Sequence, residues 1–213
     1  MKDIAIYGAG GFGREIACLI NSINKKEPSW NLIGFFDDGL PKGSSNKYGS
    51  IVGNIADLNS WDRELAIVVA IGSPTILKKI VEKITNTNIS FPNIVSPDII
   101  YYDEASLEIG KGNVICSRCL ISCNVSIGDF NILNGYIPVG HDTSIGSYNV
   151  FMPSVNISGE VKIGNCNFMG VSSSILQQIT MGNFVRIGAG SVVIRKTKDN
   201  NLYIGNPAII VKF

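Results

Sequence analysis

Residues 127–163 read IGDFNILNGYIPVGHDTSIGSYNVFMPSVNISGEVKI, and an apolar residue recurs at every sixth place in this stretch. The spacing continues in both directions, so fifteen consecutive hexads carry a large apolar residue in one register. These residues are Ile109, Ile115, Ile121, Ile127, Leu133, Val139, Ile145, Phe151, Ile157, Ile163, Met169, Ile175, Met181, Ile187 and Val193. A helix repeats every 3.6 residues and an ordinary strand every two. A period of six is instead typical of a parallel β-helix.

The length of the repeat sets the geometry of the coil. Three hexads, or 18 residues, complete one triangular turn, and each short strand pairs with its equivalent in the next coil about 4.8 Å away. We expect the large apolar residue to fill the interior and the residue two places before it to point inward as well. Glycine follows the apolar residue in eight of the fifteen hexads, where we expect it to help the chain turn. These are Gly110, Gly128, Gly140, Gly146, Gly164, Gly170, Gly182 and Gly188. Because the register does not slip between 109 and 198, no external loop should interrupt the five coils.

The first 95 residues follow a different pattern, in which short apolar runs alternate with helical periodicity. Residues 4–7, 32–36 and 65–71 are expected to be strands, and residues 14–24 and 76–84 have apolar side chains at helical spacing. Strands that alternate with helices indicate a parallel sheet. We therefore predict a Rossmann-like α/β domain over residues 1–95 and a parallel β-helix domain over residues 96–213.

The composition excludes several classes of protein. The chain of 213 residues is 45% apolar and carries a net charge of +1, which is unlike a disordered protein. Charges are balanced in both halves, with no basic stripe to suggest a nucleic-acid partner. No apolar stretch approaches the roughly 20 residues of a membrane span, and the first residues lack the features of a signal peptide. Five unevenly spaced cysteines suit reduced thiols, so we expect a cytoplasmic protein.

A glycine-rich loop joins the first expected strand to the first helix. Residues 8–13, GAGGFG, fit the pattern G-x-G-x-x-G in the context that a diphosphate site requires. Asp37 follows the second strand, where a carboxylate suits a ribose or base contact. Taken alone, this motif indicates NAD. However, 95 residues supply only half of a dinucleotide fold, and the β-helix offers no domain for hydride transfer, so an NAD-dependent enzyme is only a third option.

Together these motifs resemble the sialic acid O-acetyltransferase (NeuD) family and the related PglD-type sugar acetyltransferases. The resemblance rests on GAGGFGREI at 8–16, the pair Asp37-Asp38, AIGSP at 70–74, the unbroken hexads with GHD at 140–142, and GNPA at 205–208. It implies a left-handed β-helix, a homotrimer, and direct acetyl transfer from acetyl-CoA to a sugar or nucleotide-sugar in surface-polysaccharide biosynthesis. A purely structural Rossmann-like unit is the alternative for the first domain.

His141 is the one histidine of the chain, so it alone can use an imidazole for acid–base chemistry. A neutral imidazole can take the proton from an amine or hydroxyl that attacks a thioester, and the resemblance makes His141 the general base. Asp142 can orient the ring only if both residues lie at a corner, because neighbours in a flat strand face opposite sides. Gly159 lies 18 residues after His141, and the resemblance implies that its N–H stabilises the developing oxyanion. The bland alternatives are a solvated Asp142 and a turn glycine at 159.

The resemblance also assigns binding residues. The sugar or its nucleotide is expected at Gly10, Gly11, Phe12, Asp37, Asp38, Gly72 and Ser73. Acetyl-CoA, which is a substrate here, is expected at Val171, Gly188, Ala189, Gly190, Asn206 and Pro207, and Lys196, Lys198 and Lys212 could meet its phosphates.

Two features remain to be weighed. Cys116, Cys119 and Cys123 have a spacing that invites a zinc site, but the hexad register points them in different directions, so we expect no metal. Relatives often carry a second histidine nine residues after the first, and Val150 stands there. The acceptor therefore stays open between an amine and a hydroxyl, and a non-catalytic, sugar-nucleotide-binding trimer is the alternative function.

Overall fold

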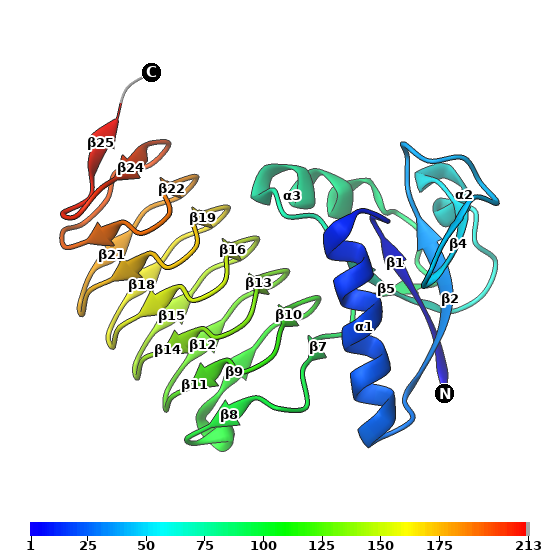
Figure 1. Ribbon diagram of the computed structural model, residues 1–213, viewed down its shortest axis with the longest axis horizontal. Coiled ribbons are helices and arrows are strands. Elements are labelled where there is room, and N and C mark those ends of the chain that lie inside the picture. Colours follow the sequence, from blue (N-terminus) through cyan, green and yellow to red (C-terminus); the bar gives the residue numbers. More distant parts are fainter. Residues whose placement is uncertain (212–213) are drawn as a thin grey trace. The chain divides into compact units, whose positions relative to one another are not determined.

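The computed structural model describes residues 1–211 and divides the chain into two compact units, Met1–Pro97 and Asp98–Phe213 (Figure 1). The first unit is an α/β domain and the second is a left-handed parallel β-helix. None of the helices within residues 1–211 is long and apolar enough to cross a membrane.

The α/β domain has a six-stranded sheet in the order β3-β4-β2-β1-β5-β6, parallel except for the β3–β4 pair. Its strands are β1 (Lys2–Tyr7), β2 (Trp30–Phe36), β3 (Ser45–Asn46), β4 (Gly49–Gly53), β5 (Leu65–Val69) and β6 (Ile89–Ser90). Its helices are α1 (Gly11–Lys26), α2 (Ile55–Asn59) and α3 (Pro74–Lys83). The apolar stripe of α1 buries Ile16 and Ile20 completely, as its helical spacing predicts.

The carboxyl ends of β1, β2 and β5 meet at one edge of this sheet. Backbone bonds tie the segments that follow them, with the Gly8 N–H donating to the Phe36 carbonyl at 2.8 Å and the Ala70 N–H donating to the Tyr7 carbonyl at 2.8 Å. Ligands of open parallel sheets bind at this edge. The glycine-rich loop, the Asp37-Asp38 pair and the Gly72-Ser73 pair all lie here.

The second unit winds short strands into three sheets, and β7 and β8 extend the helix before residue 109. One sheet contains β7 (Ile94–Val95), β10 (Val114–Ile115), β13 (Ile132–Leu133), β16 (Val150–Phe151), β19 (Phe168–Met169), β22 (Arg186–Ile187), β24 (Leu202–Ile204) and β25 (Ile209–Val211). The second contains β8 (Ile100–Tyr101), β11 (Leu120–Ile121), β14 (Pro138–Val139), β17 (Asn156–Ile157), β20 (Ser174–Ile175) and β23 (Val192–Val193). The third contains β9 (Glu108–Ile109), β12 (Ser126–Ile127), β15 (Ser144–Ile145), β18 (Lys162–Ile163) and β21 (Thr180–Met181), and a 3-10 turn, Glu104–Ser106, precedes it.

The strands pair with a constant offset of 18 residues, as the hexads predict: Ile127 faces Ile145, and Ile145 faces Ile163. Fourteen of the fifteen large apolar residues are at most 5% exposed, and Ile109 in the first of these coils is half-buried. The smaller inward residues Val125 and Val155 are also buried. The interior and the uninterrupted coils are therefore confirmed.

The expected role of the hexad glycines in turning the chain is wrong. None of the eight has a positive φ, and a Cβ on Gly146 or Gly164 would lie 2.6 Å from a carbonyl oxygen of the next coil. Glycine is needed there because adjacent coils approach closely. The turn itself falls two residues later, where φ is positive in every hexad from Arg118 (59°) to Phe184 (55°).

Three corners separate the sheets. The ladder corner comprises residues 110–113, 128–131, 146–149, 164–167 and 182–185. The histidine corner comprises residues 122–125, 140–143, 158–161 and 176–179. The third corner comprises residues 116–119, 134–137, 152–155, 170–173 and 188–191.

Candidate active site

His141 and Asp142 lie at the histidine corner, between β14 and β15. Asp142 has a φ of 56°, and this left-handed backbone turns two adjacent side chains toward each other. The Nδ1 atom of His141 lies 2.7 Å from Oδ2 of Asp142. The corner that the pairing requires is therefore present.

The hydrogen bonds of Asp142 set the protonation of the imidazole. Hydrogen bonds from His141 and then from Asn124, whose Nδ2 lies 3.0 Å from Oδ1, lower the pKa of Asp142. An ionised carboxylate can only accept. Nδ1 of His141 therefore carries the proton, and Nε2 keeps the lone pair that a general base needs.

Gly159 lies directly beneath the imidazole. A Cβ at this position would be 2.6 Å from Nε2 and 2.8 Å from Cε1 of His141. Gly159 does not have a positive φ, so the turn does not require a glycine here. Its N–H also donates to no group within residues 1–211. The absence of a side chain thus makes room for the ring and leaves an uncommitted donor beside it.

Two further contacts hold the coil under the dyad. The hydroxyl of Thr143, which is buried, donates to the Ser158 carbonyl at 3.1 Å, and the Glu160 N–H donates to the His141 carbonyl at 2.7 Å. A hollow of about 400 Å³ beside the dyad is lined by Asp142, Glu160, Lys162, Gln178 and Thr180. Sequence reasoning missed Asn124, Thr143 and Glu160, although Asn124 and Glu160 lie 18 residues on either side of Asp142.

The residues predicted for acetyl-CoA lie elsewhere. Val171, Gly188, Ala189 and Gly190 are at the third corner, so one chain does not bring them to His141. The backbone N–H groups of Val171 and Ala189 have no acceptor within residues 1–211.

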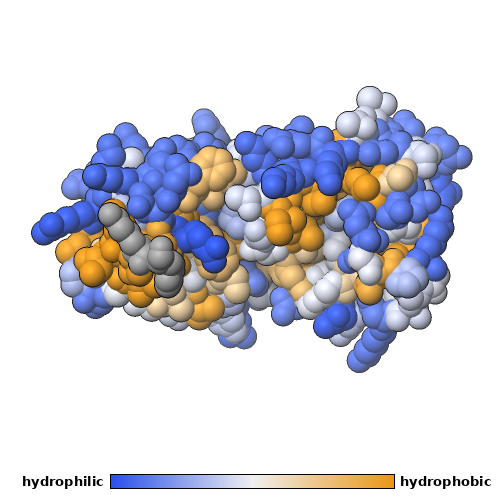
Figure 2. All heavy atoms as spheres, turned by 90° about the horizontal axis from the view of Figure 1, so that it is seen from above, coloured by the Kyte–Doolittle hydropathy of each residue, from blue (hydrophilic) through white to orange (hydrophobic). Residues whose placement is uncertain are grey.

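Asn206 and Pro207 form the turn between β24 and β25. Beside them Figure 2 shows apolar side chains gathered at the C-terminal end of the β-helix, and Ile209 is 64% exposed there. Lys196 and Lys198 are exposed after β23, and Lys212 lies outside the described residues.

The glycines of the α/β domain divide into two groups. A Cβ on Gly13 would collide with the Gly8 carbonyl, and Gly8 has a φ of 105°, so the fold itself requires both glycines. At Gly10 and Gly72 a Cβ would meet nothing within 4 Å, and at Gly11 it would meet only the Arg14 guanidinium at 4.0 Å. These exposed glycines leave open backbone that a ligand can approach.

The carboxylates at this edge tie loops together. Oδ2 of Asp37 accepts from the Ala9 N–H at 2.9 Å, and Oδ1 of Asp38 accepts from the Ile55 N–H at 2.9 Å. Burial first, and then the nearby Asp38 carboxylate, raise the pKa of Tyr7, whose hydroxyl therefore stays protonated.

Phe12 and Ser73 are half-buried at the starts of α1 and α3. The model thus places the predicted nucleotide residues at one edge, where their role stays a prediction.

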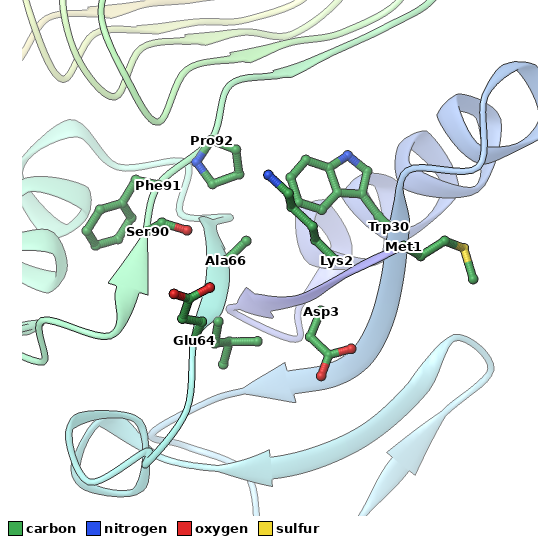
Figure 3. Close-up of a pocket in the computed structure, with 10 residues that line it drawn as sticks. Met1, Lys2, Asp3, Trp30, Glu64, Ala66, Ser90, Phe91 and Pro92 are labelled. Atoms are coloured by element: carbon green, nitrogen blue, oxygen red, sulfur yellow. The ribbon is translucent and has the colours of Figure 1, made fainter.

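A second hollow of the α/β domain, about 590 Å³, lies at the opposite edge of the sheet (Figure 3). Lys2, Trp30 and Leu65 at the starts of three parallel strands line it, together with Glu64 and Ser90. None of the predicted nucleotide residues belongs to this hollow.

Cys116, Cys119 and Cys123 spread over two corners, with Cys119 buried inside the coil. Burial raises the pKa of the Cys119 thiol to about 11. Residues 1–211 contain no group of three His, Cys, Asp or Glu side chains that could hold a metal ion. Val150 is 1% exposed on β16, whose sheet does not border the histidine corner.

A histidine–aspartate pair at the corner of a left-handed β-helix, over a glycine with a free N–H, defines a hexapeptide-repeat acyltransferase. The family model of the PglD N-terminal domain matches residues 3–84. With the whole-chain similarities that follow, this match shows that the chain belongs to the PglD-type family of sugar acetyltransferases. No curated protein matches the sequence.

Solved structures match the whole chain. The acetyltransferase domain of PglB from Neisseria gonorrhoeae FA1090, solved with acetyl coenzyme A, is 28% identical, with a TM-score of 0.88 over 99% of both chains. WeeI from Acinetobacter baumannii AYE is 27% identical, with a TM-score of 0.88 over 99% of this chain and 100% of its own. PerB from Caulobacter crescentus, solved with CoA and GDP-perosamine, is 25% identical, with a TM-score of 0.84 over 100% of this chain and 98% of its own.

Proposed function

We propose that this protein transfers the acetyl group of acetyl-CoA to the amine of a nucleotide-linked amino sugar, with His141 as general base. The observation that carries the proposal is the imidazole of His141, which is paired with Asp142 and rests on Gly159. The relatives support the substrates, because PglB was solved with acetyl coenzyme A and PerB with CoA and GDP-perosamine. Two further structures of the Caulobacter enzyme carry a histidine replaced by asparagine or alanine.

The chemistry follows from the tautomer. Nε2 of His141 takes a proton from the amine as its nitrogen attacks the thioester carbonyl. The Gly159 N–H donates to the oxygen of the tetrahedral intermediate, where negative charge develops. When the C–S bond breaks, the imidazolium returns its proton to the leaving sulfur, and the products are an acetamido sugar and CoA with a free thiol.

We propose a homotrimer because one chain separates the two halves of the site. His141 and Gly159 lie at the histidine corner, whereas Val171 and Ala189 lie at the third corner. Both corners border the β8–β23 sheet, and Ile100, which faces outward from this sheet, is 53% exposed. A second copy packed along this sheet would set the third corner of one chain beside the histidine corner of the other.

The α/β domain would hold the nucleotide of the acceptor. Open backbone at Gly10, Gly11 and Gly72 and the N-terminus of α1 suit a diphosphate. Acetyl-CoA and sugar nucleotides are cytoplasmic substrates, and the five cysteines form no disulfide in the described residues, so we place the reaction in the cytoplasm.

Release of free thiol from acetyl-CoA tests the proposal. The purified protein is assayed with UDP-, GDP- and CMP-linked amino sugars, each matched with the corresponding hydroxy sugar. We expect release with at least one amino sugar, and thermal stabilisation by the same nucleotide, because a ligand that binds only the folded state raises the apparent stability. Release with hydroxy sugars alone would make the enzyme an O-acetyltransferase. Nucleotide binding without any release would favour the non-catalytic trimer.

A further inference from the structure

Glu160 occupies the same place in its coil that Asp142 occupies one coil earlier. Both have a left-handed backbone, with φ of 59° and 56°, and both line the hollow of about 400 Å³ beside the dyad. The Glu160 N–H donates to the His141 carbonyl at 2.7 Å, so its position is fixed relative to the histidine. The proposed mechanism gives this second carboxylate no role.

Two amides hold the carboxylate of Glu160. Nε2 of Gln177 lies 2.9 Å from Oε1, and Nε2 of Gln178 lies 3.1 Å from Oε2. These bonds, first from Gln177 and then from Gln178, lower the pKa of Glu160, and the proximity of His141 acts in the same direction. The carboxylate is therefore ionised at neutral pH and cannot turn freely into solvent.

We propose that Glu160 is a positioning residue whose fixed negative charge stabilises the imidazolium of His141 during acetyl transfer. The inference rests on the proposed function, in which Nε2 takes a proton from the amine as the N–C bond forms and returns it to the sulfur as the C–S bond breaks. Positive charge resides on the ring between these two steps. A carboxylate held one coil away favours that charge without giving up a hydrogen bond to it.

The other charges around His141 provide the controls. Asp142 contacts the ring itself, Cys123 lies one coil before it, and Lys162 brings the opposite charge to the same hollow as Glu160. Removing Lys162 should therefore have the opposite effect to removing Glu160. Glu108 on β9 is a matched distant charge, because three strand spacings of about 4.8 Å separate β9 from β18. That distance exceeds the Debye length of about 8 Å at 0.15 M salt.

The solitary histidine makes a direct test possible, since an untagged protein has a single imidazole signal in NMR. The pH titration of that signal is followed without substrates in the wild type, Glu160→Gln, Lys162→Gln and Glu108→Gln. We expect the midpoint to fall by roughly 0.2–0.5 pH units in Glu160→Gln, to rise in Lys162→Gln, and to stay unchanged in Glu108→Gln. Salt at 0.5 M should shrink both shifts. Circular dichroism checks that each variant is folded.

Activity provides the second readout. In Glu160→Gln we expect kcat to fall about threefold to tenfold with the KM for acetyl-CoA unchanged, and the acid limb of the pH–rate profile to move with the NMR midpoint. An unchanged midpoint in Glu160→Gln, or a shift equal to that of Glu108→Gln, would overturn the role of Glu160. A shifted midpoint in a protein that acetylates no acceptor would support the effect on the imidazole and overturn the proposed function instead.

Discussion

Two corners of one β-helix follow the same backbone path and carry opposite chemistry. At the ladder corner the backbone N–H of each coil is bonded by a side chain of the next: Asp129 donates to Oγ of Ser147 at 3.0 Å, and Ser147 donates to Oδ1 of Asn165 at 2.8 Å. At the histidine corner the equivalent N–H groups of His141 and Gly159 have no acceptor within residues 1–211. The repeat thus satisfies its polar groups at one corner and leaves donors available at the other.

The interior shows the same contrast. Behind the ladder corner, Asn113, Asn131, Asn149 and Asn167 stack as a buried column in which each Oδ1 accepts a backbone N–H of the adjacent coil. Behind the histidine corner the equivalent places are held by Val125, Thr143 and Val161. We infer that the ladder corner stabilises the β-helix and the histidine corner is kept for catalysis. Substitutions at the two corners should therefore affect different measurements.

His141→Ala should have the largest effect. Loss of the general base is expected to lower kcat by roughly 10²–10⁴-fold. The melting temperature should hardly change, because the side chain is 49% exposed. Thiol release and a thermal melt of the same preparation check both expectations. Wild-type turnover in the alanine variant would remove the histidine corner from the mechanism.

Gly159→Ala should come next. The added methyl would lie 2.6 Å from Nε2, so the imidazole must move away from the position where it meets the amine. We expect kcat to fall about 100-fold, since misplacement of a catalytic group by about 1 Å has this order of effect. Ser147→Ala is the matched change at the ladder corner, where it removes the acceptor of the Asp129 N–H. It should leave kcat unchanged, and equal losses of activity in the two variants would contradict the division of roles.

Asn149→Ala should reverse the pattern by lowering stability without lowering kcat. The side chain accepts from the Asn167 N–H at 2.9 Å and donates to the Gly164 carbonyl at 3.0 Å, and it is fully buried. Each orphaned buried group costs about 1–3 kcal/mol. We expect the free energy of unfolding to fall by about 3 kcal/mol in urea denaturation. A loss of less than about 1 kcal/mol would show that the column contributes little.

The sequence predicted the interior of the β-helix because burial acts on every hexad alike. It did not reveal the positive φ at the corners, since residues such as Arg118, Phe130 and Tyr136 occupy a conformation that usually favours glycine or asparagine. The buried asparagine column was readable from its spacing of 18 residues but was not recognised. In the α/β domain, β3, β4, α2 and β6 were missed because most are too short to show a period.

The active site was predictable to the same extent. His141 and Gly159 lie 18 residues apart, so periodicity alone places them on one corner. The pairing of His141 with Asp142 and the clamp of Gln177 and Gln178 on Glu160 depend on side-chain conformation, which spacing does not determine.

Acid pH should produce the smallest effect and should separate stability from activity at two carboxylates. Hydrogen bonds lower the pKa of Asp199, which ends the ladder by accepting from the Asn183 N–H at 2.9 Å, and also the pKa of Asp142. A depressed folded pKa gives stability that is present above the unfolded value, near 3.8, and is lost as the pH falls through the folded value. Asp199→Asn should therefore melt below the wild type at pH 6 and match it more closely at pH 3.

Asp142→Asn tests the same carboxylate chemistry at the histidine corner. Its melting temperature should follow the same trend with pH, but kcat at pH 7 should also fall about tenfold or more, because an amide can hold the imidazole in the wrong tautomer. Asp199→Asn should keep its turnover at pH 7. If both variants lost activity alike, the two corners would not be functionally distinct; if neither showed the pH trend in thermal melts, the hydrogen bonds at both corners would contribute nothing to stability.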